Sequence, residues 1–569
     1  MNSLLNTDGY KTGHVFQYPK GTEYVYSNWT PRKSRITGIN HVVHFGLQHF
    51  IKKWLIYDFN INFFEQPRGL VVNQYKRMMD NYLGPDSVSV NHIGELHDLG
   101  YLPLKIKSLP EGSLVPMRVP AITIINTEPR FYWLTNYIET LMSAELWGPS
   151  TSATIAREYR RLLDHYCEKT GGDPNFVQFQ GHDFSMRGML GVEAAKLSGM
   201  GHLLSFVGTD TIPAIIELEK YYGANSDAEL VGCSVPATEH AICCAGQKEN
   251  EQETFRRLIE DVYPSGIVSL VSDSWDLWKV LTEYLPNLKG KILARNGKVV
   301  IRPDSGDPVD ILCGNFSTVQ DVTNEADNFE EFKEYVEEDI IDFVRDDTPH
   351  GEYGVDEHSI IYKFQGKYYE CTIDNFQWNR YDKQFYFIDF YEKPNLIVEE
   401  IQLLPENKGA IELLWDVFGG TINEKGYKVL DPHIGAIYGD SITLERCQQI
   451  CERLEKKGFA STNVVFGIGS FTYQYNTRDT FGFAMKATWC QINGKQFDIF
   501  KDPVTDDGTK KSAKGLIAVQ LDASGEYYYE DQVTQQCEEK LNYLKTVFEN
   551  GKLIDPCTLS EIRNRISKS

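Results

Sequence analysis

Polar residues with acid, base and anion-binding chemistry follow a series of short apolar runs in the middle of the chain. The polar residues at the ends of these runs are His182, Asp183, Arg187, Asp210, His240, Asp273, Arg302, Asp304 and Asp440. An arginine can bind an anion through two parallel hydrogen bonds, and an aspartate can accept from sugar hydroxyls or hold Mg²⁺. The set therefore favours a site for an anionic ligand that carries hydroxyl groups.

The densest of these segments is IRPDSG at 301–306, which follows the apolar residues VVI. It places Arg302, Asp304, a hydroxyl and a glycine together, and a Ser-Gly turn lets backbone N–H groups approach a phosphate. A salt bridge between Arg302 and Asp304 that closes a turn is the structural alternative. The pattern alone leaves both readings open.

His240 ends the segment SVPATEH at 234–240. An imidazole in a polar turn can donate a proton, bind a phosphate or accept a phosphoryl group, because its nitrogen is nucleophilic near neutral pH. A structural histidine is the alternative. The equivalent positions of Asp210, Arg302 and Asp304 at other run ends favour a functional role.

A glycine turn, VVFGIGS at 464–470, offers backbone amides to a phosphate through Gly469 and Ser470. It matches neither the dinucleotide-binding glycine motif nor a P-loop. Cations gather in the acidic chain beyond it, as a polyphosphate site would require, although a solvated surface explains them as well. These cations are Arg478, Lys486, Lys501, Lys510, Lys511 and Lys514.

The segments that carry these residues have the pattern of strand-plus-helix units. Several apolar runs from about residue 175 onward are spaced by about 25–35 residues, the length of such a unit, and buried parallel strands read as continuous apolar runs. We expect an α/β fold with a βα barrel-like core, in which the loops after the strands form one active-site mouth. A doubly wound open sheet has the same pattern. Residues 1–175 predict an α+β domain that packs with a C-terminal segment, 471–569.

The core, expected over 176–470, is interrupted by an insertion at about 312–425. Residues 321–350 hold twelve acidic and two basic residues, which predicts an exposed acidic helix. The following residues alternate like a strand meander. A solvated decoration is the plain interpretation, and a lid or assembly element is the alternative.

Composition excludes several classes of protein. With 569 residues, 41% of them hydrophobic and 24% charged, the chain is globular rather than disordered or collagen-like. Its formal net charge of −23 disfavours nucleic acid and anionic membranes as partners. No secretory signal or membrane-spanning run is visible, and eleven cysteines at irregular spacing read as reduced thiols, so we expect a cytoplasmic protein.

Taken together and in order, the motifs resemble those of the nicotinamide phosphoribosyltransferases, the type II phosphoribosyltransferases of NAD salvage. The resemblance covers nearly the whole chain except roughly 312–425. The matching segments are TDGYKTGHVFQYP, WLTNYIET, GHDFSMRG, GTDT, SVPATEH, VSDSWD, IRPDSGDP, the GD pair at 439–440, FGIGS, TRD, FKDPV and VFENGKL.

The resemblance implies transfer of the 5-phosphoribosyl group from phosphoribosyl pyrophosphate to nicotinamide, giving nicotinamide mononucleotide and pyrophosphate. It also implies Mg²⁺ on the pyrophosphate, ATP as a coupled co-substrate that phosphorylates His240, and a homodimer with shared active sites. Mg²⁺ ligands in the protein are left open, with Asp304 and Asp440 nearest by motif. Nicotinate phosphoribosyltransferase and a non-catalytic interaction protein on the same fold are the rival readings.

By motif position, Phe184 and Tyr10 of the partner subunit would sandwich the pyridine ring. Asp210 would accept the carboxamide NH₂ and repel the carboxylate of nicotinic acid. The remaining expected contacts are Asp8 at the interface, Arg187 and Arg302 on the ligand, Ser234 and Ser269 lining the pocket, Asp304 and Asp440 at the ribose and metal, Gly439, Gly469 and Ser470 at the phosphate turns, and Arg32, Arg478, Lys486 and Lys501 around the phosphates. Ser470 and Ile468 depart from the family's usual glycine turn, which we expect to narrow it.

Overall fold

The computed structural model describes residues 1–315, 319–347, 359–373, 376–379, 384–387, 396–439, 441–501 and 513–568. Over these residues the chain forms two compact units. The first contains residues 1–161, 181–234 and 468–569, and the second contains residues 162–180 and 235–467. The long helix α6, Glu139–Thr170, begins in the first unit and ends in the second.

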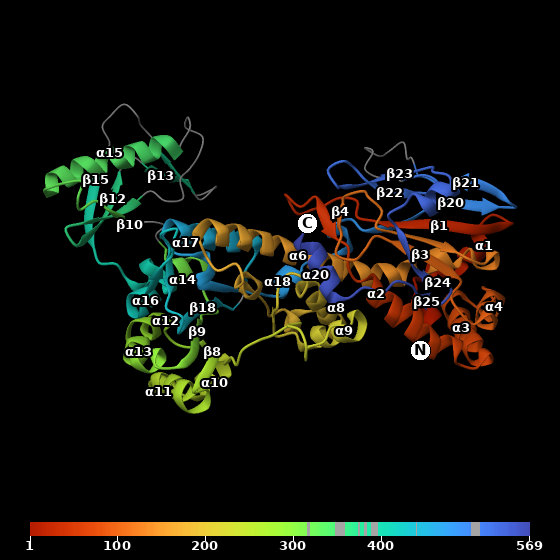
Figure 1. The fold of residues 1–569 in the computed structure, drawn as a ribbon, viewed down its shortest axis with the longest axis horizontal. Coiled ribbons are helices and arrows are strands. Elements are labelled where there is room, and N and C mark those ends of the chain that lie inside the picture. Colours follow the sequence, from red (N-terminus) through yellow and green to blue (C-terminus); the bar gives the residue numbers. More distant parts are fainter. Residues whose placement is uncertain are drawn as a thin grey trace. The chain divides into compact units, whose positions relative to one another are not determined.

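An antiparallel sheet joins both ends of the chain in the first unit (Figure 1). Its order is β21-β20-β1-β5-β3-β24-β25. The bounds are β1 Thr22–Thr30, β3 Leu104–Ser108, β5 Ile122–Asn126, β20 Ala484–Ile492, β21 Lys495–Asp498, β24 Lys545–Glu549 and β25 Lys552–Leu553. Since β1 pairs with β5 on one side and with β20 on the other, the expected α+β region built from both ends of the chain is confirmed.

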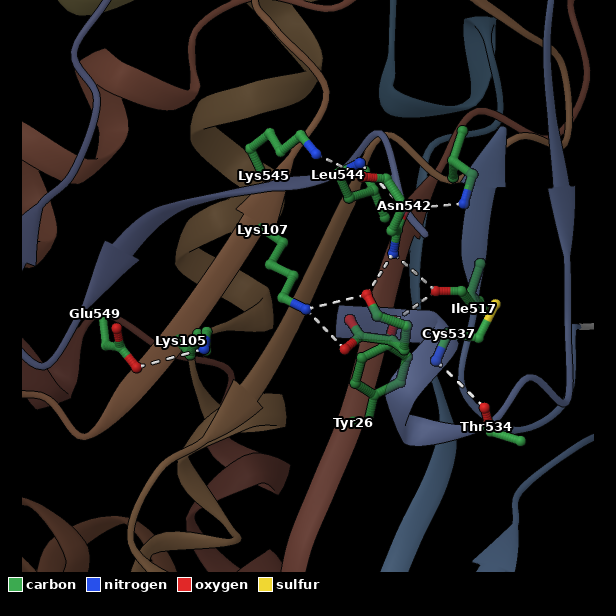
Figure 2. A network of polar contacts seen from close by, with 12 residues as sticks. Tyr26, Lys105, Lys107, Ile517, Thr534, Cys537, Asn542, Leu544, Lys545 and Glu549 are labelled. Atoms are coloured by element: carbon green, nitrogen blue, oxygen red, sulfur yellow. Dashed lines mark hydrogen bonds and ion pairs between the residues drawn. The ribbon is translucent and has the colours of Figure 1, made fainter. Parts of the chain in front are cut away.

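A buried ion pair fastens the C-terminal segment to this sheet (Figure 2). Lys107 Nζ on β3 donates to Glu538 Oε2 at 2.7 Å, from α19 (Gln535–Lys540), and both side chains are about nine-tenths buried. Asn542 donates to the carbonyls of Ile517 and Glu538 and accepts from the N–H of Val519. Because the buried polar groups of Lys107, Glu538 and Asn542 have hydrogen-bond partners, specific polar contacts as well as apolar packing hold the C-terminal segment on the sheet.

The first unit also holds the parallel pair β6 (Gly181–Asp183) and β7 (Gly208–Thr209). Helix α8, Val192–His202, connects them, and α9, Ile212–Tyr222, follows β7. Gly199 allows the close packing of α8 on α9, since a Cβ there would lie 2.6 Å from the Cβ of Ala214. The strand-helix-strand unit brings the residues after β6 and β7 to one edge.

The second unit contains the parallel strands β8 (Ser265–Val271), β9 (Asn296–Arg302), β18 (Ile434–Tyr438) and β19 (Val464–Ile468), the last ending at the unit boundary. β9 pairs with β8 on one side and β18 on the other, and β18 also pairs with β19. The helices of this unit include α10 His240–Ala245, α11 Glu251–Arg257, α13 Leu285–Leu293, α14 Pro308–Cys313, α16 Pro405–Phe418 and α17 Leu444–Lys456. The expected α/β class with parallel βα units is confirmed.

Two apolar runs do not form the strands that their patterns predict. Residues Val177–Gln180 are the short helix α7, because the buried Gln180 amide donates to the carbonyls of Ser461 and Val464 and leaves only β6 extended. The run at 230–240 makes isolated bridges at Cys233 and Ala237 instead of a strand. Periodicity could not foresee either, since both depend on side-chain and backbone partners far along the chain.

The insertion has a hydrophobic core of its own. Strands β10 (Val319–Asp321), β11 (Ser359–Phe364), β12 (Lys367–Ile373) and β15 (Leu396–Ile401) form a sheet, and helix α15, Phe329–Asp347, lies across it (Figure 1). Phe332 on α15 stacks on Phe364 with centroids 4.8 Å apart. The acidic helix is confirmed, and the meander is a folded sheet. Among the described residues, no helix is long and apolar enough to span a bilayer.

Candidate functional site

Asp210 follows β7 and is held by two side chains of the first unit. Its Oδ1 accepts from His182 Nε2 at 2.9 Å and from Ser234 Oγ at 2.6 Å. The backbone N–H of Asp210 donates to the carbonyl of Asp183, which fixes the turn. The carboxylate is nevertheless 44% exposed. It is therefore oriented by the protein and still open to a ligand.

Phe184 follows Asp183, whose carbonyl accepts from the Asp210 N–H, so it lies near the Asp210 carboxylate. Its N–H donates to the carbonyl of Ile468 at 3.0 Å, and its half-buried ring lies 4.5 Å from the His182 ring at a 39° tilt. Arg187 follows on the short turn Met186–Gly188 and is exposed. An aromatic face, an oriented carboxylate and an exposed guanidinium thus surround the carboxyl ends of β6 and β7.

The glycine turn departs from its family pattern at Ser470, which begins α18, Ser470–Gln474. A Cβ at Gly188 would overlap the Ser470 hydroxyl, so Ser470 packs directly against the backbone after Arg187. Gly469 itself has an extended backbone, with φ of −93°. The serine therefore fills space next to the turn, and Gly188 accommodates it.

In the second unit, Asp273 organises the loop after β9. Its Oδ2 accepts from the N–H groups of Asp304 and Ser305 at 2.8 Å each and from the Ser305 hydroxyl at 2.5 Å. Its Oδ1 lies 3.2 Å from His240 Nε2, at the start of α10. The Asp273 side chain is only 6% exposed, whereas that of His240 is 45% exposed. One buried carboxylate thus ties the histidine to the Asp304 loop.

Gly439 is required where the chain passes Arg302 and Asp304. Its N–H donates to the carbonyl of Pro303, and a Cβ on it would collide with Asp304 Oδ1 and lie 3.3 Å from Arg302 Nε. The structure therefore brings Arg302, Asp304 and Gly439 together. Asp440 lies outside the described residues.

Ser269 is buried in β8 and acts through its backbone. Its N–H donates to the carbonyl of Pro236, and its own carbonyl accepts from Thr238 N–H. These bonds hold the segment that leads to His240. The observed contacts make Ser269 a support for that segment.

Three of the predicted cations gather in the first unit. Arg32 donates through Nε to the carbonyl of Gly482, and Lys486 faces outward from β20. Partial removal from water lowers the pKa of Lys486, and the neighbouring charges of Arg32 and Arg478 lower it further. The Glu139 carboxylate opposes this effect and raises the pKa of Lys486, so cations and one carboxylate share this part of the first unit.

Asp8, Tyr10 and Lys501 are the remaining predicted site residues that the structure describes. Asp8 accepts from the Thr140 hydroxyl at 2.8 Å, and Tyr10 is 64% exposed with its ring against His14. Lys501 is exposed. Lys510 and Lys511 lie outside the described residues, as do all of 502–512.

His182 and Asp273 lie at the ends of apolar runs, but no role in the site was predicted for either. His182 is hydrogen-bonded to Asp210, and Asp273 is hydrogen-bonded to His240, so these two residues position side chains of the candidate site. Ser305 was predicted only as the hydroxyl of the Ser-Gly turn and not as a partner of Asp273, and Lys11, which pairs with Glu139, was not predicted. Position after an apolar run was the available signal for Asp273 and Ser305. Within the described part of the chain, no three His, Cys, Asp or Glu side chains converge to hold a metal ion.

The sequence matches two family profiles. Residues 179–343 and 390–552 match the nicotinate phosphoribosyltransferase (NAPRTase) family, and residues 2–106 match the N-terminal domain of nicotinamide phosphoribosyltransferase. The protein "Nicotinamide phosphoribosyltransferase" of Acinetobacter baylyi is 49% identical over 100% of this chain and 97% of its own length. The chain belongs to the nicotinamide phosphoribosyltransferase family. A Xanthomonas campestris protein of the same name is 29% identical over 99% of this chain and 97% of its own length.

Among solved structures, the nicotinate-nucleotide pyrophosphorylase of Pyrococcus furiosus aligns over 100% of this chain and 95% of its own, with 12% identity and a TM-score of 0.48. The Acinetobacter baylyi relative matches the insertion-bearing chain along its full length at 49% identity. The family resemblance drawn from the motifs is therefore confirmed.

Proposed function

We propose that this member of the nicotinamide phosphoribosyltransferase family transfers the 5-phosphoribosyl group of phosphoribosyl pyrophosphate to the ring nitrogen of nicotinamide. The observation that carries the proposal is Asp210, an open carboxylate oriented by His182 and Ser234 next to the Phe184 ring. A carboxylate accepts from the amide NH₂ of nicotinamide and repels the carboxylate of nicotinic acid. One charge would thus set the choice between the two substrates.

The transfer needs positioning and charge stabilisation more than covalent catalysis. Breaking the bond at the anomeric carbon develops positive charge on the sugar and releases pyrophosphate as an anion. Arg302 and Arg187 would bind the anionic ligand, while Asp304 would accept from ribose hydroxyls beside Gly439. The cations Arg32, Arg478, Lys486 and Lys501 would enclose the phosphates, with Gly469 and Ser470 at the phosphate turn.

Mg²⁺ fits this arrangement as a group carried mainly by the pyrophosphate. The oxygens of Asp273 accept from four donors, so Asp304 is the described carboxylate that would approach the metal. Asp440 follows Gly439 in sequence. Mg²⁺ commonly binds one or two protein carboxylates together with substrate phosphates. When bound, it would neutralise charge on the leaving pyrophosphate.

His240 would accept a phosphoryl group from ATP in a coupled side reaction. If its Nε2–H donates to Asp273, the lone pair of Nδ1 is the nucleophile that attacks the γ-phosphorus while ADP leaves. The side chain is 45% exposed, so a phosphate can reach it. Asp273 links that histidine to Asp304 and Ser305, which offers a route from phosphorylation to the sugar site.

The site would be completed in a cytoplasmic homodimer, with Tyr10 of the partner subunit on the second face of the ring. Exposed apolar residues support such an interface: Leu190 is 84%, Phe471 59% and Tyr475 80% exposed. Leu190 N–H donates to Gln474 on α18, and the rings of Phe471 and Tyr475 stack 5.2 Å apart, so the patch is ordered. Co-assembling Tyr10→Ala with Asp210→Ala chains should restore part of the lost activity, and no restoration would contradict shared sites.

The decisive experiment measures mononucleotide formation by the purified protein with phosphoribosyl pyrophosphate and Mg²⁺. Nicotinamide and nicotinic acid are compared, each with and without ATP. We expect turnover of nicotinamide, improved by ATP in the wild type and not in His240→Ala. Turnover of nicotinic acid alone would favour nicotinate phosphoribosyltransferase, and turnover of neither would favour a non-catalytic role.

A further inference from the structure

His202 is a fully buried histidine that the proposed chemistry does not use. It is the last residue of α8 and is 0% exposed. Its Nε2 lies 2.9 Å from the carbonyl oxygen of Gly208, and its Nδ1 lies 2.7 Å from the hydroxyl of Tyr473. Both ring nitrogens are therefore engaged, by partners on two different elements.

The two bonds fix the direction of each hydrogen. A carbonyl can only accept, so Nε2 carries the hydrogen that goes to Gly208. Burial lowers the pKa of His202, which keeps the ring neutral and leaves Nδ1 as an acceptor. Burial raises the pKa of Tyr473 well above its usual value, so its hydroxyl stays protonated and donates to Nδ1.

Each partner lies close in sequence to one part of the candidate site. Gly208 begins β7, two residues before Asp210, and pairs with His182. Tyr473 lies on α18, three residues after Ser470, which packs against Gly188. His202 is thus one hydrogen bond from the strand of the amide-recognising carboxylate and one from the helix of the glycine turn.

Packing around His202 leaves little freedom for the ring. Phe206 stacks on it with centroids 5.3 Å apart, and Phe206 in turn lies against Gly181, where a Cβ would come within 2.8 Å of the ring. On the other side, the Tyr159 hydroxyl lies 3.2 Å from that of Thr472, beside Tyr473 on α18. Because the His202 ring is packed this tightly, a displacement of one of its hydrogen-bond partners also displaces the other.

We propose that His202 is a positioning residue that couples the strand carrying Asp210 to the turn of Gly469 and Ser470. The nicotinamide-facing carboxylate and the phosphate-facing turn are then held in register by one imidazole. This inference rests on the proposed function for what each part binds. The coupling itself is a property of β7, α8 and α18, and it can be tested with each ligand separately.

Three substitutions test the hydrogen bonds of His202 to Tyr473 and to Gly208 one at a time. Tyr473→Phe removes only the hydroxyl, and His202→Gln keeps a donor near the Nε2 position while losing the acceptor for Tyr473. His202→Asn does the reverse, because its amide oxygen reaches about as far as Nδ1. Tyr75→Phe is the control, since it removes another buried tyrosine hydroxyl, 3.3 Å from Tyr137, away from the site.

The readouts are the KM values for phosphoribosyl pyrophosphate and nicotinamide, and the rise in melting temperature that Mg²⁺-phosphoribosyl pyrophosphate alone produces. Tyr473→Phe and His202→Gln should raise KM for phosphoribosyl pyrophosphate about five- to tenfold, as expected for one buried hydrogen bond, with a smaller change for nicotinamide. His202→Asn should mainly raise KM for nicotinamide. The double variant His202→Gln with Tyr473→Phe should be no worse than either single variant.

A purely structural role would lower the melting temperature without separating the two KM values, and that result would overturn the proposal. Additive losses in the double variant would also contradict it. If the histidine variants fail to fold, Tyr473→Phe alone still decides, because it removes one oxygen atom. If the wild type forms no mononucleotide, the proposed function fails, and the ligand-induced melting shifts of wild type and Tyr473→Phe still test the coupling.

Discussion

Asp210 and Asp273 are both aspartates that follow apolar runs of the α/β core, yet the structure uses them in opposite ways. Asp210 is 44% exposed and accepts from two side chains at a single oxygen. Asp273 is 6% exposed and accepts from two backbone N–H groups, a hydroxyl and an imidazole. The open carboxylate is suited to recognise a ligand, whereas the buried one builds the loop that others use.

Glu251, at the start of α11, is a third carboxyl group and differs from both aspartates. It is 2% exposed, and its Oε1 has no hydrogen-bond partner within the described chain. Burial raises its pKa to about 7, and the nearby Asp276 carboxylate raises it as well. Burial without donors therefore favours the protonated form, while the donors around Asp273 satisfy a charge.

Loss of the buried Asp273 carboxylate should reduce activity most. Asp273→Ala leaves His240 and the Asp304 loop without their common acceptor, so kcat/KM for mononucleotide formation should fall about a thousandfold, as expected for several hydrogen bonds to one charged group. Steady-state kinetics with nicotinamide measures this. Asp261→Ala, an exposed aspartate paired with Arg256, is the control. A loss of less than threefold would show that Asp273 does not organise the loop.

A smaller effect concerns Glu251 and the dependence of stability on pH. In the unfolded chain this carboxyl ionises near its ordinary value, while the folded protein holds the proton up to about pH 7. The unfolded state therefore binds fewer protons in between, and stability falls as pH rises from about 4.5 to 7.

Glu251→Gln should remove that decline, which we expect to be about 3 kcal/mol because the rise of the pKa from 4.5 to about 7 costs about 1.4 kcal/mol per unit. Urea unfolding between pH 5 and 8 measures the difference. Glu249→Gln, at an exposed neighbouring position, should keep the wild-type profile. Parallel profiles for wild type and Glu251→Gln would contradict the account of this carboxyl.

The smallest effect concerns one of the two donors to Asp210. Ser234→Ala removes one donor to the carboxylate and leaves the His182 donor in place, so kcat/KM for nicotinamide should fall only about threefold to fivefold, the range for one partly exposed hydrogen bond. Ser560→Ala removes a similar surface bond, to Glu229, and should change nothing. A loss as large as that of Asp273→Ala would erase the distinction between the open and the buried aspartate.

Much of this site could be predicted because parallel strands end at one edge of a sheet. Arg302, Asp304 and Gly439 follow the neighbouring parallel strands β9 and β18, and this pairing alone brings their loops together. The same logic covers the α+β region, where strong apolar patterns at both ends of the chain, such as Thr22–Thr30 and Ala484–Ile492, pair as neighbouring strands.

The division of labour between the aspartates could not be predicted. It depends on which donors lie within about 3 Å, and the donors of Asp273 come from residues 31 and 32 positions away. Likewise, α7 replaced an expected strand because Gln180 found partners more than 280 residues further along the chain. Nor does the acidic pattern of 321–350 show that α15 packs through Phe332 on a sheet of its own.

We expect the open carboxylate of Asp210 to select the amide over the acid. The most direct measurement is the ratio of kcat/KM for nicotinamide to that for nicotinic acid in the wild type and in Asp210→Asn, which keeps the size of the side chain and removes its charge. We expect the ratio to fall about a hundredfold, with nicotinic acid gaining, because the like-charge repulsion is lost. An unchanged ratio would contradict the account.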